Sequence, residues 1–346
     1  PGDLAYLTNH FPPFPTTVFS EQMRGMGHAF LILPVAGEPI LVTDPRGYRH
    51  DLVPIERAIA AADLGAAVVA ALRDAELDRS RVALADEDIL PAAFAHYFRE
   101  ELPALDLVPD DSIVSRLRRI KSPAEQQLLR EAARCADAGL RAAVARIGQP
   151  GVTERDVCAA GAAAAIEAGA DFVRYFRVHS GPWSAAGSRW PPAMDRVIEP
   201  GDVVAMDVIG AFGGYGFDVN RTTVKGAPDA RARALLDAVD AATAAAVARC
   251  TAGASVAAVV AAGHGVLREA GFADYMGRMI GHGIGLETVE APYLLPDVSE
   301  QIEPGMTLCI EPGASIPGWA GASIEQEIIV TAGAPEIITP TPTRLW

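Results

Sequence analysis

Two stretches of the chain carry apolar strand patterns on both sides of a glycine turn, and each predicts a β-hairpin. The first covers residues 203–224 and has four glycines between residues 210 and 216. Glycine supplies the positive φ that a tight turn needs, so this cluster indicates where the chain reverses. The second hairpin covers residues 303–332 and turns near Gly318.

Helical periodicity precedes each hairpin. Residues 122–147 and 153–169 each open on a capping box, in which a Ser or Thr is followed three residues later by an acid. Residues 228–250 and 254–270 have the same apolar period. The order helix, helix, hairpin therefore occurs twice, which weakly indicates an internal duplication without a residue-level repeat.

The first third of the chain predicts a separate α/β domain, because strand-like and helix-like segments alternate there. The expected strands cover residues 30–35, 39–43 and 82–85, and the expected helices cover residues 55–71 and 90–100. The aromatic, proline-rich residues 10–15 are typical of a rigid loop. A chain of 346 residues is long for one core, so we expect two domains, residues 1–112 and 113–346, and a mixed α/β (α+β) fold.

Composition limits the classes of partner. A net charge of −15 argues against nucleic acid and against an anionic membrane surface. The one basic cluster, residues 116–121, is interpreted as a solvated surface between the domains. Four scattered cysteines without a CxxC motif predict buried free thiols in a reducing cytoplasm, and the sequence has no signal peptide and no apolar run long enough to span a membrane. The chain starts at Pro1 without a methionine, so we expect a short leader to be missing.

Each strand of the first hairpin carries one carboxylate. If the turn is centred between Phe212 and Gly213, Asp207 and Asp218 stand directly opposite each other, with Cβ atoms about 5 Å apart. Like charges in that position destabilise a sheet unless a cation lies between them. A divalent metal ion is the natural candidate.

The second hairpin repeats the arrangement. A turn centred on Gly318 places Glu311 opposite Glu325, whereas Glu327 shares a strand face with Glu325 and competes for the same role. Spacing favours Glu325 modestly. Between the two hairpins, His282 is flanked by Gly281 and Gly283, which is typical of a place where the backbone approaches another group closely.

These residues together predict a catalytic metal site. Four carboxylates and one imidazole, without a thiolate, suit Mn²⁺, Co²⁺, Fe²⁺ or Zn²⁺. Five ligands with carboxylates able to bridge suit two ions, which would activate a bridging water for attack on an amide carbon. The alternative, solvated turn residues, does not explain why each acid lies in an apolar strand. The proposed ligands are Asp207, Asp218, His282, Glu311 and Glu325.

At these residues the chain resembles the creatinase/aminopeptidase P/prolidase family of M24 metallopeptidase-like proteins. The order Asp, Asp, His, Glu, Glu recurs with spacings of 11, 64, 29 and 14 residues. The resemblance also includes the segments 119–125, 214–222, 281–286 and 311–313. It implies a creatinase-like N-terminal domain followed by a pita-bread catalytic domain of two helix–helix–hairpin halves. It further implies that the five residues bind two divalent metal ions, that Glu311 serves as the catalytic base, and that the chain forms a homodimer.

The chain departs from the family pattern around the substrate. Two histidines usual in the peptidases are replaced by Trp190 and Val289, and the arginine usual two residues before Glu325 is Ser323. Asn220 replaces a threonine. A loop histidine, His179, is a candidate to take over proton transfer.

The first hypothesis is therefore a dinuclear hydrolase of C–N bonds that resembles Xaa-Pro aminopeptidases and prolidases and acts on a small peptide. The alternative is a non-peptidase member, a small-molecule amide or amidine hydrolase or a lyase, with a pocket shaped by Trp190, Val289 and Tyr215. A third hypothesis, a binding module without catalysis, predicts lost ligands, and none is lost.

Overall fold

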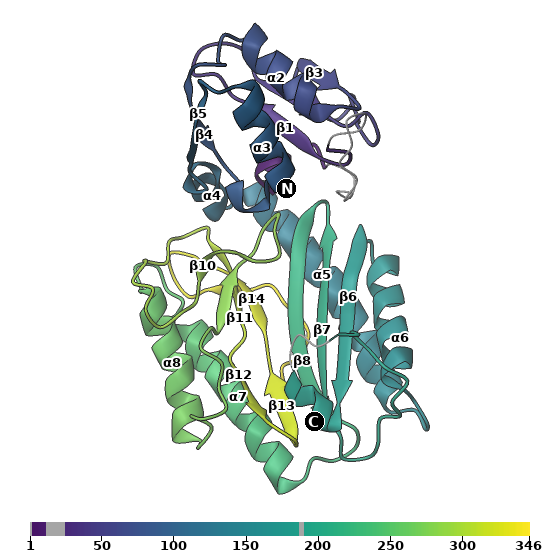
Figure 1. Ribbon diagram of the computed structural model, residues 1–346. Coiled ribbons are helices and arrows are strands. Elements are labelled where there is room, and N and C mark those ends of the chain that lie inside the picture. Colours follow the sequence, from purple (N-terminus) through teal and green to yellow (C-terminus); the bar gives the residue numbers. More distant parts are fainter. Residues whose placement is uncertain (1, 12–24, 187–189) are drawn as a thin grey trace. The chain divides into compact units, whose positions relative to one another are not determined.

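The computed structural model describes residues 2–11, 25–186 and 190–346, in two compact units, Pro1–Arg118 and Arg119–Trp346 (Figure 1). Residues 12–15 of the expected rigid loop lie outside this described part. Among the helices of the described residues, none is both long and apolar enough to cross a membrane. All four cysteines are free, and all but the half-buried Cys158 are buried.

The described part of the first unit contains two small sheets and the helices around them. One sheet has the order β1-β2-β3, with β1 (Ala29–Ile32) antiparallel to β2 (Ile40–Thr43), and β2 parallel to β3 (Arg57–Ala60). The other is a parallel pair, β4 (Arg81–Leu84) and β5 (Asp106–Pro109). The helices are α1 (Gly2–Thr8), α2 (Leu64–Asp74), the short 3₁₀ turn η1 (Glu87–Ile89), α3 (Ala92–Glu101) and α4 (Ser112–Arg119). Strands β1 and β2 pack with α2 and α3 around a core that contains Phe94 and Phe98.

The helix expected over residues 55–71 is partly wrong. Residues 57–60 form β3 instead, because they pair with β2 and so satisfy their backbone groups in the sheet. The helix begins only after Asp63, whose carboxylate accepts a hydrogen bond from the Ala66 N–H at 3.0 Å. The long-range strand pairing overrides the local helical pattern.

The solvated interpretation of the basic cluster is also wrong for two of its four basic residues. Arg118 is buried at the end of α4, and its guanidinium donates a hydrogen bond to Asp3 at 2.6 Å. Lys121 is buried too, with its Nζ 3.1 Å from Glu290 Oε2. Two of these basic side chains therefore serve as buried charge partners.

In the second unit, strands form the inner layer and helices the outer one (Figure 1). The sheet of the first half has the order β6-β7-β8, made of β6 (Phe172–Ser180), β7 (Val203–Phe212) and β8 (Tyr215–Val224). Its helices are α5 (Pro123–Ile147) and α6 (Glu154–Glu167), and the 3₁₀ turn η2 (Gly181–Ala186) follows β6. The second half has the helices α7 (Ala230–Arg249) and α8 (Val256–Glu269). Its larger sheet has the order β10-β9-β11-β14-β15. The strands of this sheet are β9 (Gly281–Gly283), β10 (Glu290–Tyr293), β11 (Thr307–Ile310), β14 (Gln326–Ile329) and β15 (Glu336–Ile337). The smaller sheet pairs β12 (Gly313–Ile316) with β13 (Ala320–Ser323). The predicted order of two helices and a hairpin, twice over, is confirmed.

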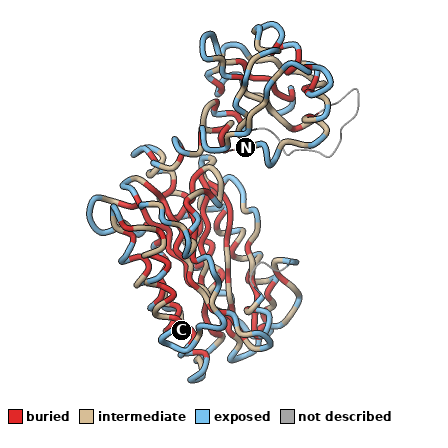
Figure 2. Tube along the Cα trace, turned by 60° about the vertical axis from the view of Figure 1, so that its left-hand side comes forward, coloured by how far each residue is buried: buried red, intermediate tan, exposed pale blue. Residues whose placement is uncertain are grey.

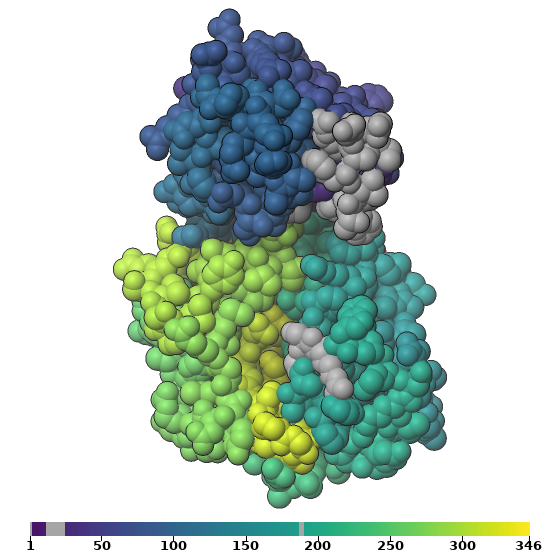
Figure 3. Space-filling view, in the orientation of Figure 1, coloured from purple at the N-terminus to yellow at the C-terminus, as the bar shows by residue number. Residues whose placement is uncertain are grey.

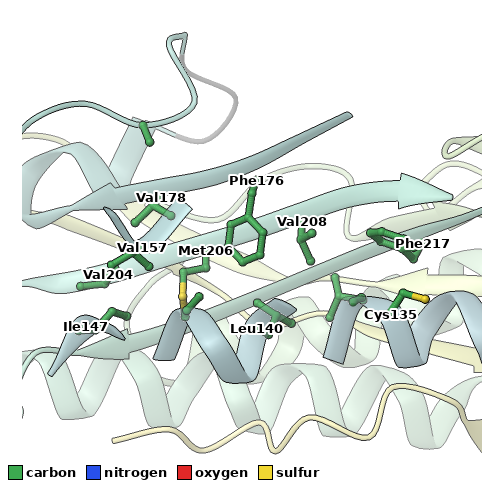
Figure 4. Packing of buried hydrophobic residues seen from close by; sticks show 14 of the residues in the cluster. Cys135, Leu140, Ile147, Val157, Phe176, Val178, Val204, Met206, Val208 and Phe217 are labelled. Atoms are coloured by element: carbon green, nitrogen blue, oxygen red, sulfur yellow. The ribbon is translucent and has the colours of Figure 1, made fainter. Parts of the chain in front are cut away.

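The core of the first half explains which way its strands face. Val204, Met206 and Val208 of β7 are fully buried and pack with Leu140 of α5 (Figure 4). Because side chains alternate along a strand, the residue between Met206 and Val208 points away from this core. That residue is Asp207. Buried residues, in red, run through the middle of this unit (Figure 2), and its strands hold more of them than its helices do.

The first hairpin forms as predicted, but its register differs from the prediction. The turn is centred between Gly213 and Gly214, which both have positive φ, of 57° and 79°. A two-residue turn with two positive φ values is the type that fits the strand twist, so it is favoured over a turn centred one residue earlier. As a result, Phe212 pairs with Tyr215 across the turn.

This shift changes the relation of the two aspartates. Asp207 pairs with Asn220, and Asp218 pairs with Ile209. The expected direct opposition of Asp207 and Asp218 is therefore wrong. They are diagonal neighbours on one face of the sheet instead.

The second hairpin has the predicted register. Gly313 pairs with Ser323 in the β12–β13 ladder, and Ile310 pairs with Gln326 in the β11–β14 ladder. Glu311 and Glu325 occupy the break between these two ladders, where the paired strands pass from one sheet to the other. Both acids therefore stand at the junction of the two sheets.

Candidate metal centre

The two aspartates face the second hairpin. One carboxylate oxygen each from Asp207, Asp218 and Glu325 lie within 4.8 Å of one another. The Asp218 N–H donates a hydrogen bond to Glu327 Oε1 at 2.7 Å, and the Glu325 N–H donates to the Asn220 carbonyl at 3.0 Å. These backbone contacts lock the two hairpins together and bring their acids to one place. In Figure 3 the C-terminal strands, in yellow, lie between the green and teal surfaces of the two halves.

His282 enters the site from β9. A Cβ at Gly281 would lie 2.0 Å from the Cys309 carbonyl oxygen, so only glycine lets β9 run this close to β11. The Nδ1 of His282 is 2.9 Å from the Gly283 carbonyl oxygen, which can only accept, so Nδ1 carries the proton. Burial lowers the pKa of His282, and the ring is therefore neutral. Its Nε2 lone pair points into the site.

That lone pair faces carboxylate oxygens. The Nε2 atom is 3.7 Å from Asp218 Oδ2 and 3.6 Å from Glu311 Oε1. A neutral ring with its proton on Nδ1 has no hydrogen to donate to either oxygen. The ring therefore supplies no proton between these three groups, which is an arrangement that a cation would fill.

Burial dominates the electrostatics of the acids. Burial raises the pKa of Glu311 to about 7, and the charge of Asp207 adds to the rise. Burial also raises the pKa values of Asp218 and Glu325 well above their usual range, and neighbouring carboxylates raise them further. The pKa of Asp207 is raised by burial as well, although the Arg177 guanidinium opposes the rise.

Glu325 gives the sharpest test of whether the site fits a cation. Its side chain is 1% exposed, and neither carboxylate oxygen has a hydrogen-bond partner among the described residues. A buried carboxylate without a partner is strongly unfavourable, and a divalent cation removes that penalty. The residues present therefore fit a divalent metal ion that is bound by carboxylate oxygen and imidazole nitrogen. The five predicted residues are brought together, while their role as ligands stays a prediction.

Two charged neighbours of the site, Arg177 and Arg221, were not singled out by the sequence analysis. Arg177 on β6 donates a hydrogen bond to Asp207 Oδ2 at 2.7 Å. Arg221 is fully buried and donates to the backbone oxygen of Glu325. Glu327, considered only as a rival ligand, is fully buried opposite Cys309, and burial raises its pKa to about 8.

The residues expected around the substrate lie in different environments. His179 belongs to β6 rather than to a loop, and it is buried on the same face as Arg177, because it pairs with Ala205 two positions from Asp207. Its Nε2 lies 3.4 Å from the Pro191 carbonyl oxygen. The described structure leaves Trp190 79% exposed and Val289 46% exposed.

Tyr215 does not join the acids. It is buried at the turn end of β8, an odd number of positions from Asp218, and so lies on the opposite face of the strand. Its hydroxyl donates a hydrogen bond to Glu125 Oε1 of α5 at 2.9 Å.

A comparison with protein families matches the part of the sequence that contains this site. The model of metallopeptidase family M24 matches residues 127–332, which include all five of the converging residues. The chain belongs to metallopeptidase family M24. It is accordingly an enzyme, a metallohydrolase, and membership implies divalent metal cofactors.

Relatives and solved structures agree over nearly the whole chain. A probable dipeptidase PepE of Mycobacterium tuberculosis is 34% identical over 324 residues, covering 91% of this chain and 84% of the relative. The solved Xaa-Pro dipeptidase from Bacillus anthracis has a TM-score of 0.84 and 28% identity, covering 99% of this chain and 91% of its own. The dipeptidase PepE from Mycobacterium ulcerans has a TM-score of 0.81 and 30% identity, covering 99% and 90%. The expected pita-bread fold is confirmed.

Proposed function

We propose that this metallohydrolase cleaves the amide bond of dipeptides, including those with proline in the second position, with the help of two divalent metal ions. The observation that carries the proposal is the convergence of four carboxylates, two of them buried and two half-buried, and a neutral imidazole from two hairpins and β9. The ions would be held by Asp207, Asp218, His282, Glu311 and Glu325. When bound, such ions polarise an amide carbonyl and lower the pKa of water.

Each remaining step falls to side chains of this chain. Glu311 is the best-placed general base, because it is the most exposed acid of the set at 29%. We assign His179 to the leaving amine, since it lies on the site face of β6 next to Arg177. Trp190 and Val289 are proposed to contact the substrate through their exposed surfaces, and we assign Tyr215 no part in catalysis.

The relatives support a peptide substrate. Their printed names are dipeptidase and Xaa-Pro dipeptidase. Mn²⁺, Co²⁺, Zn²⁺ and Fe²⁺ are the ions that the donor set suits best. We also propose a homodimer in the cytoplasm, in line with the family resemblance and the four free thiols.

The second candidate function is that of a hydrolase or a lyase that acts on a small molecule other than a peptide. It is favoured by Trp190 and Val289, which stand where the peptidases of the family carry histidines and which cannot act as a general acid or base. The loss of such general acid–base help typically lowers a rate by about 10²- to 10⁴-fold.

One experiment separates the two candidates. Metal-free protein is reconstituted with Mn²⁺, Co²⁺ or Zn²⁺ and assayed against Ala-Pro, Met-Pro and Ala-Ala. The dipeptidase is supported if the protein turns over a dipeptide and Glu311→Gln lowers that turnover by at least about 10³-fold. The exposed control Glu303→Gln should leave the turnover unchanged. Stoichiometric ion binding without turnover of any dipeptide refutes it in favour of the second candidate, and absence of ion binding refutes both.

A further inference from the structure

One of the four cysteines lies inside the metal centre. Cys309 is fully buried on β11, where it pairs with His282 of β9 on one side and with Glu327 of β14 on the other. Residues that pair directly across a sheet share a face, so the imidazole, the thiol and the carboxyl form a row. The sequence analysis predicted a donor set without a thiolate, and the strand order β9-β11-β14 adds a thiol to it.

The distances in this row suit a single ion. One ligand atom each from His282, Cys309 and Glu325 lie within 4.8 Å of one another. A tetrahedral zinc ion with bonds of about 2.0–2.3 Å holds its ligand atoms about 3.3–3.8 Å apart. The three atoms therefore need to approach one another by at most about 1.5 Å to share an ion. Among the described residues, Cys309 is the one cysteine that belongs to such a group.

The acids beside the thiol are a second, independent sign of a cation. Glu325 is 1% exposed, and neither of its carboxylate oxygens has a hydrogen-bond partner among the described residues. Glu327 is fully buried, and its Oε2 likewise has no partner there. The thiol itself donates only a long hydrogen bond, 3.9 Å from its Sγ to the Asp218 carbonyl oxygen. Buried oxygens without partners next to a thiol and an imidazole mark a place that a cation satisfies.

We propose that His282, Cys309 and Glu325 form a separate binding position for a thiophilic divalent cation such as Zn²⁺ or Cd²⁺. Thiolate sulfur selects soft and borderline ions, whereas carboxylate oxygen suits Mn²⁺. When the ion binds, the S–H bond of Cys309 breaks, the sulfur forms a bond to the ion, and the proton passes to the solvent. The position shares His282 and Glu325 with the two-ion centre of the proposed function, so the two arrangements exclude each other. The inference does not depend on that function.

The test uses Cd²⁺, because a cadmium–thiolate bond produces a strong charge-transfer absorption in the ultraviolet. Metal-free, reduced protein is titrated with Cd²⁺ and, in parallel, with Mn²⁺. The wild type is expected to develop this absorption with Cd²⁺ until one equivalent is bound, and to develop none with Mn²⁺. Cys309→Ser should lose the absorption and bind Cd²⁺ at least about 10-fold more weakly, while its Mn²⁺ dissociation constant changes less than about 2-fold.

Cys158→Ser is the matched control. Cys158 is half-buried, and it is therefore the cysteine most accessible to an adventitious Cd²⁺ ion. Its removal should leave the absorption and the Cd²⁺ affinity unchanged. Circular dichroism verifies that the metal-free variants fold, and Cys309→Ala replaces Cys309→Ser if the latter does not fold. Cadmium NMR of Cd²⁺-loaded Cys158→Ser detects the sulfur ligand without any change at Cys309.

Each outcome decides the matter. Absence of the charge-transfer absorption in the wild type overturns the inference, as does absorption that survives in Cys309→Ser or disappears in Cys158→Ser. Equal weakening of Mn²⁺ and Cd²⁺ binding in Cys309→Ser also overturns it. These results leave the two-ion dipeptidase intact. A wild type that shows the cadmium–thiolate absorption but binds no Mn²⁺, Co²⁺ or Zn²⁺ at the two-ion centre refutes the proposed function instead and supports this inference.

Discussion

Glu327 makes the metal-free protein sensitive to pH in an unusual direction. Burial raises the pKa of this carboxyl from 4.5 to about 8. Burial likewise raises the pKa of Glu311 from 4.5 to about 7. A carboxyl with a raised pKa holds its proton more tightly in the folded chain than in the unfolded chain. Between pH 4.5 and 8 the folded chain therefore binds more protons, and its stability falls as the pH rises.

The magnitude follows from these two pKa values. Each pKa unit corresponds to about 1.4 kcal/mol, so by pH 8 the ionisation of Glu327 lowers the free energy of unfolding by about 4–5 kcal/mol. Glu311 adds about 3 kcal/mol by the same arithmetic. Since a typical domain is stable by about 5–15 kcal/mol, the metal-free catalytic unit is expected to be marginal at pH 8.

Other acids with shifted pKa values affect stability outside the range from pH 4.5 to pH 8. Asp44 and Asp51 have pKa values lowered to about 2 by hydrogen bonds from Arg46 and Arg49. Their contribution is present above the ordinary aspartate pKa of about 4 and is lost only as the pH falls toward 2. They do not contribute to a change between pH 5 and pH 8.

The assay is thermal unfolding of metal-free protein in EDTA at pH 5, 6, 7 and 8, followed by circular dichroism. The wild type is expected to unfold at progressively lower temperature as the pH rises. Glu327→Gln keeps an acceptor for the Asp218 N–H and cannot ionise, so at pH 8 it should unfold about 10 °C above the wild type. At pH 5, where the wild-type carboxyl is neutral, the two should differ little.

Two controls sharpen the result. Glu303→Gln makes the same substitution at an exposed position and should follow the wild type at every pH. Saturating Mn²⁺ should flatten the pH dependence, because a bound ion favours ionised ligands. The reasoning is refuted if wild-type stability is constant or rises from pH 5 to pH 8 in EDTA, or if Glu327→Gln is no more stable than the wild type at pH 8.

Two further substitutions test how the backbone positions the site. Gly281→Ala should destabilise the protein by about 3 kcal/mol and lower its ion content in metal analysis. The reason is that the new Cβ would meet the Cys309 carbonyl oxygen and push His282 out of place. Unchanged ion content would contradict this role of Gly281. Lys121→Met should cost about 3–5 kcal/mol in chemical denaturation, because it leaves the buried Glu290 without its ammonium partner. The double variant Lys121→Met/Glu290→Gln should recover much of that loss, and no recovery would count against the ion pair.

The five converging residues were predictable from sequence because each lies in a strong local pattern. The two hairpins have glycine turns, which place their acids on one face, and His282 stands between two glycines. Local alternation and turn chemistry are sufficient to predict such features. The family model and the relatives then confirm the family to which the pattern points.

The charge partners could not be predicted in the same way. Arg177 meets Asp207 only because β6 pairs with β7, a contact between positions 30 residues apart. Arg221 reaches the carbonyl of Glu325 over 104 residues of sequence. Such contacts depend on the three-dimensional order of strands, and no local period carries that information.

The turn of the first hairpin explains how a third carboxylate reaches the two aspartates. In the register expected from sequence, Asp207 and Asp218 would face each other with Cβ atoms about 5 Å apart, which leaves little space between them. The two positive φ angles of the Gly213–Gly214 turn shift the pairing and make the aspartates diagonal neighbours, which are typically about 7–8 Å apart. The shift also puts Asn220 opposite Asp207, and its carbonyl accepts the N–H of Glu325 at 3.0 Å. Glu325 is thereby fixed beside both aspartates, so the two-glycine turn determines the space in which a cation can bind.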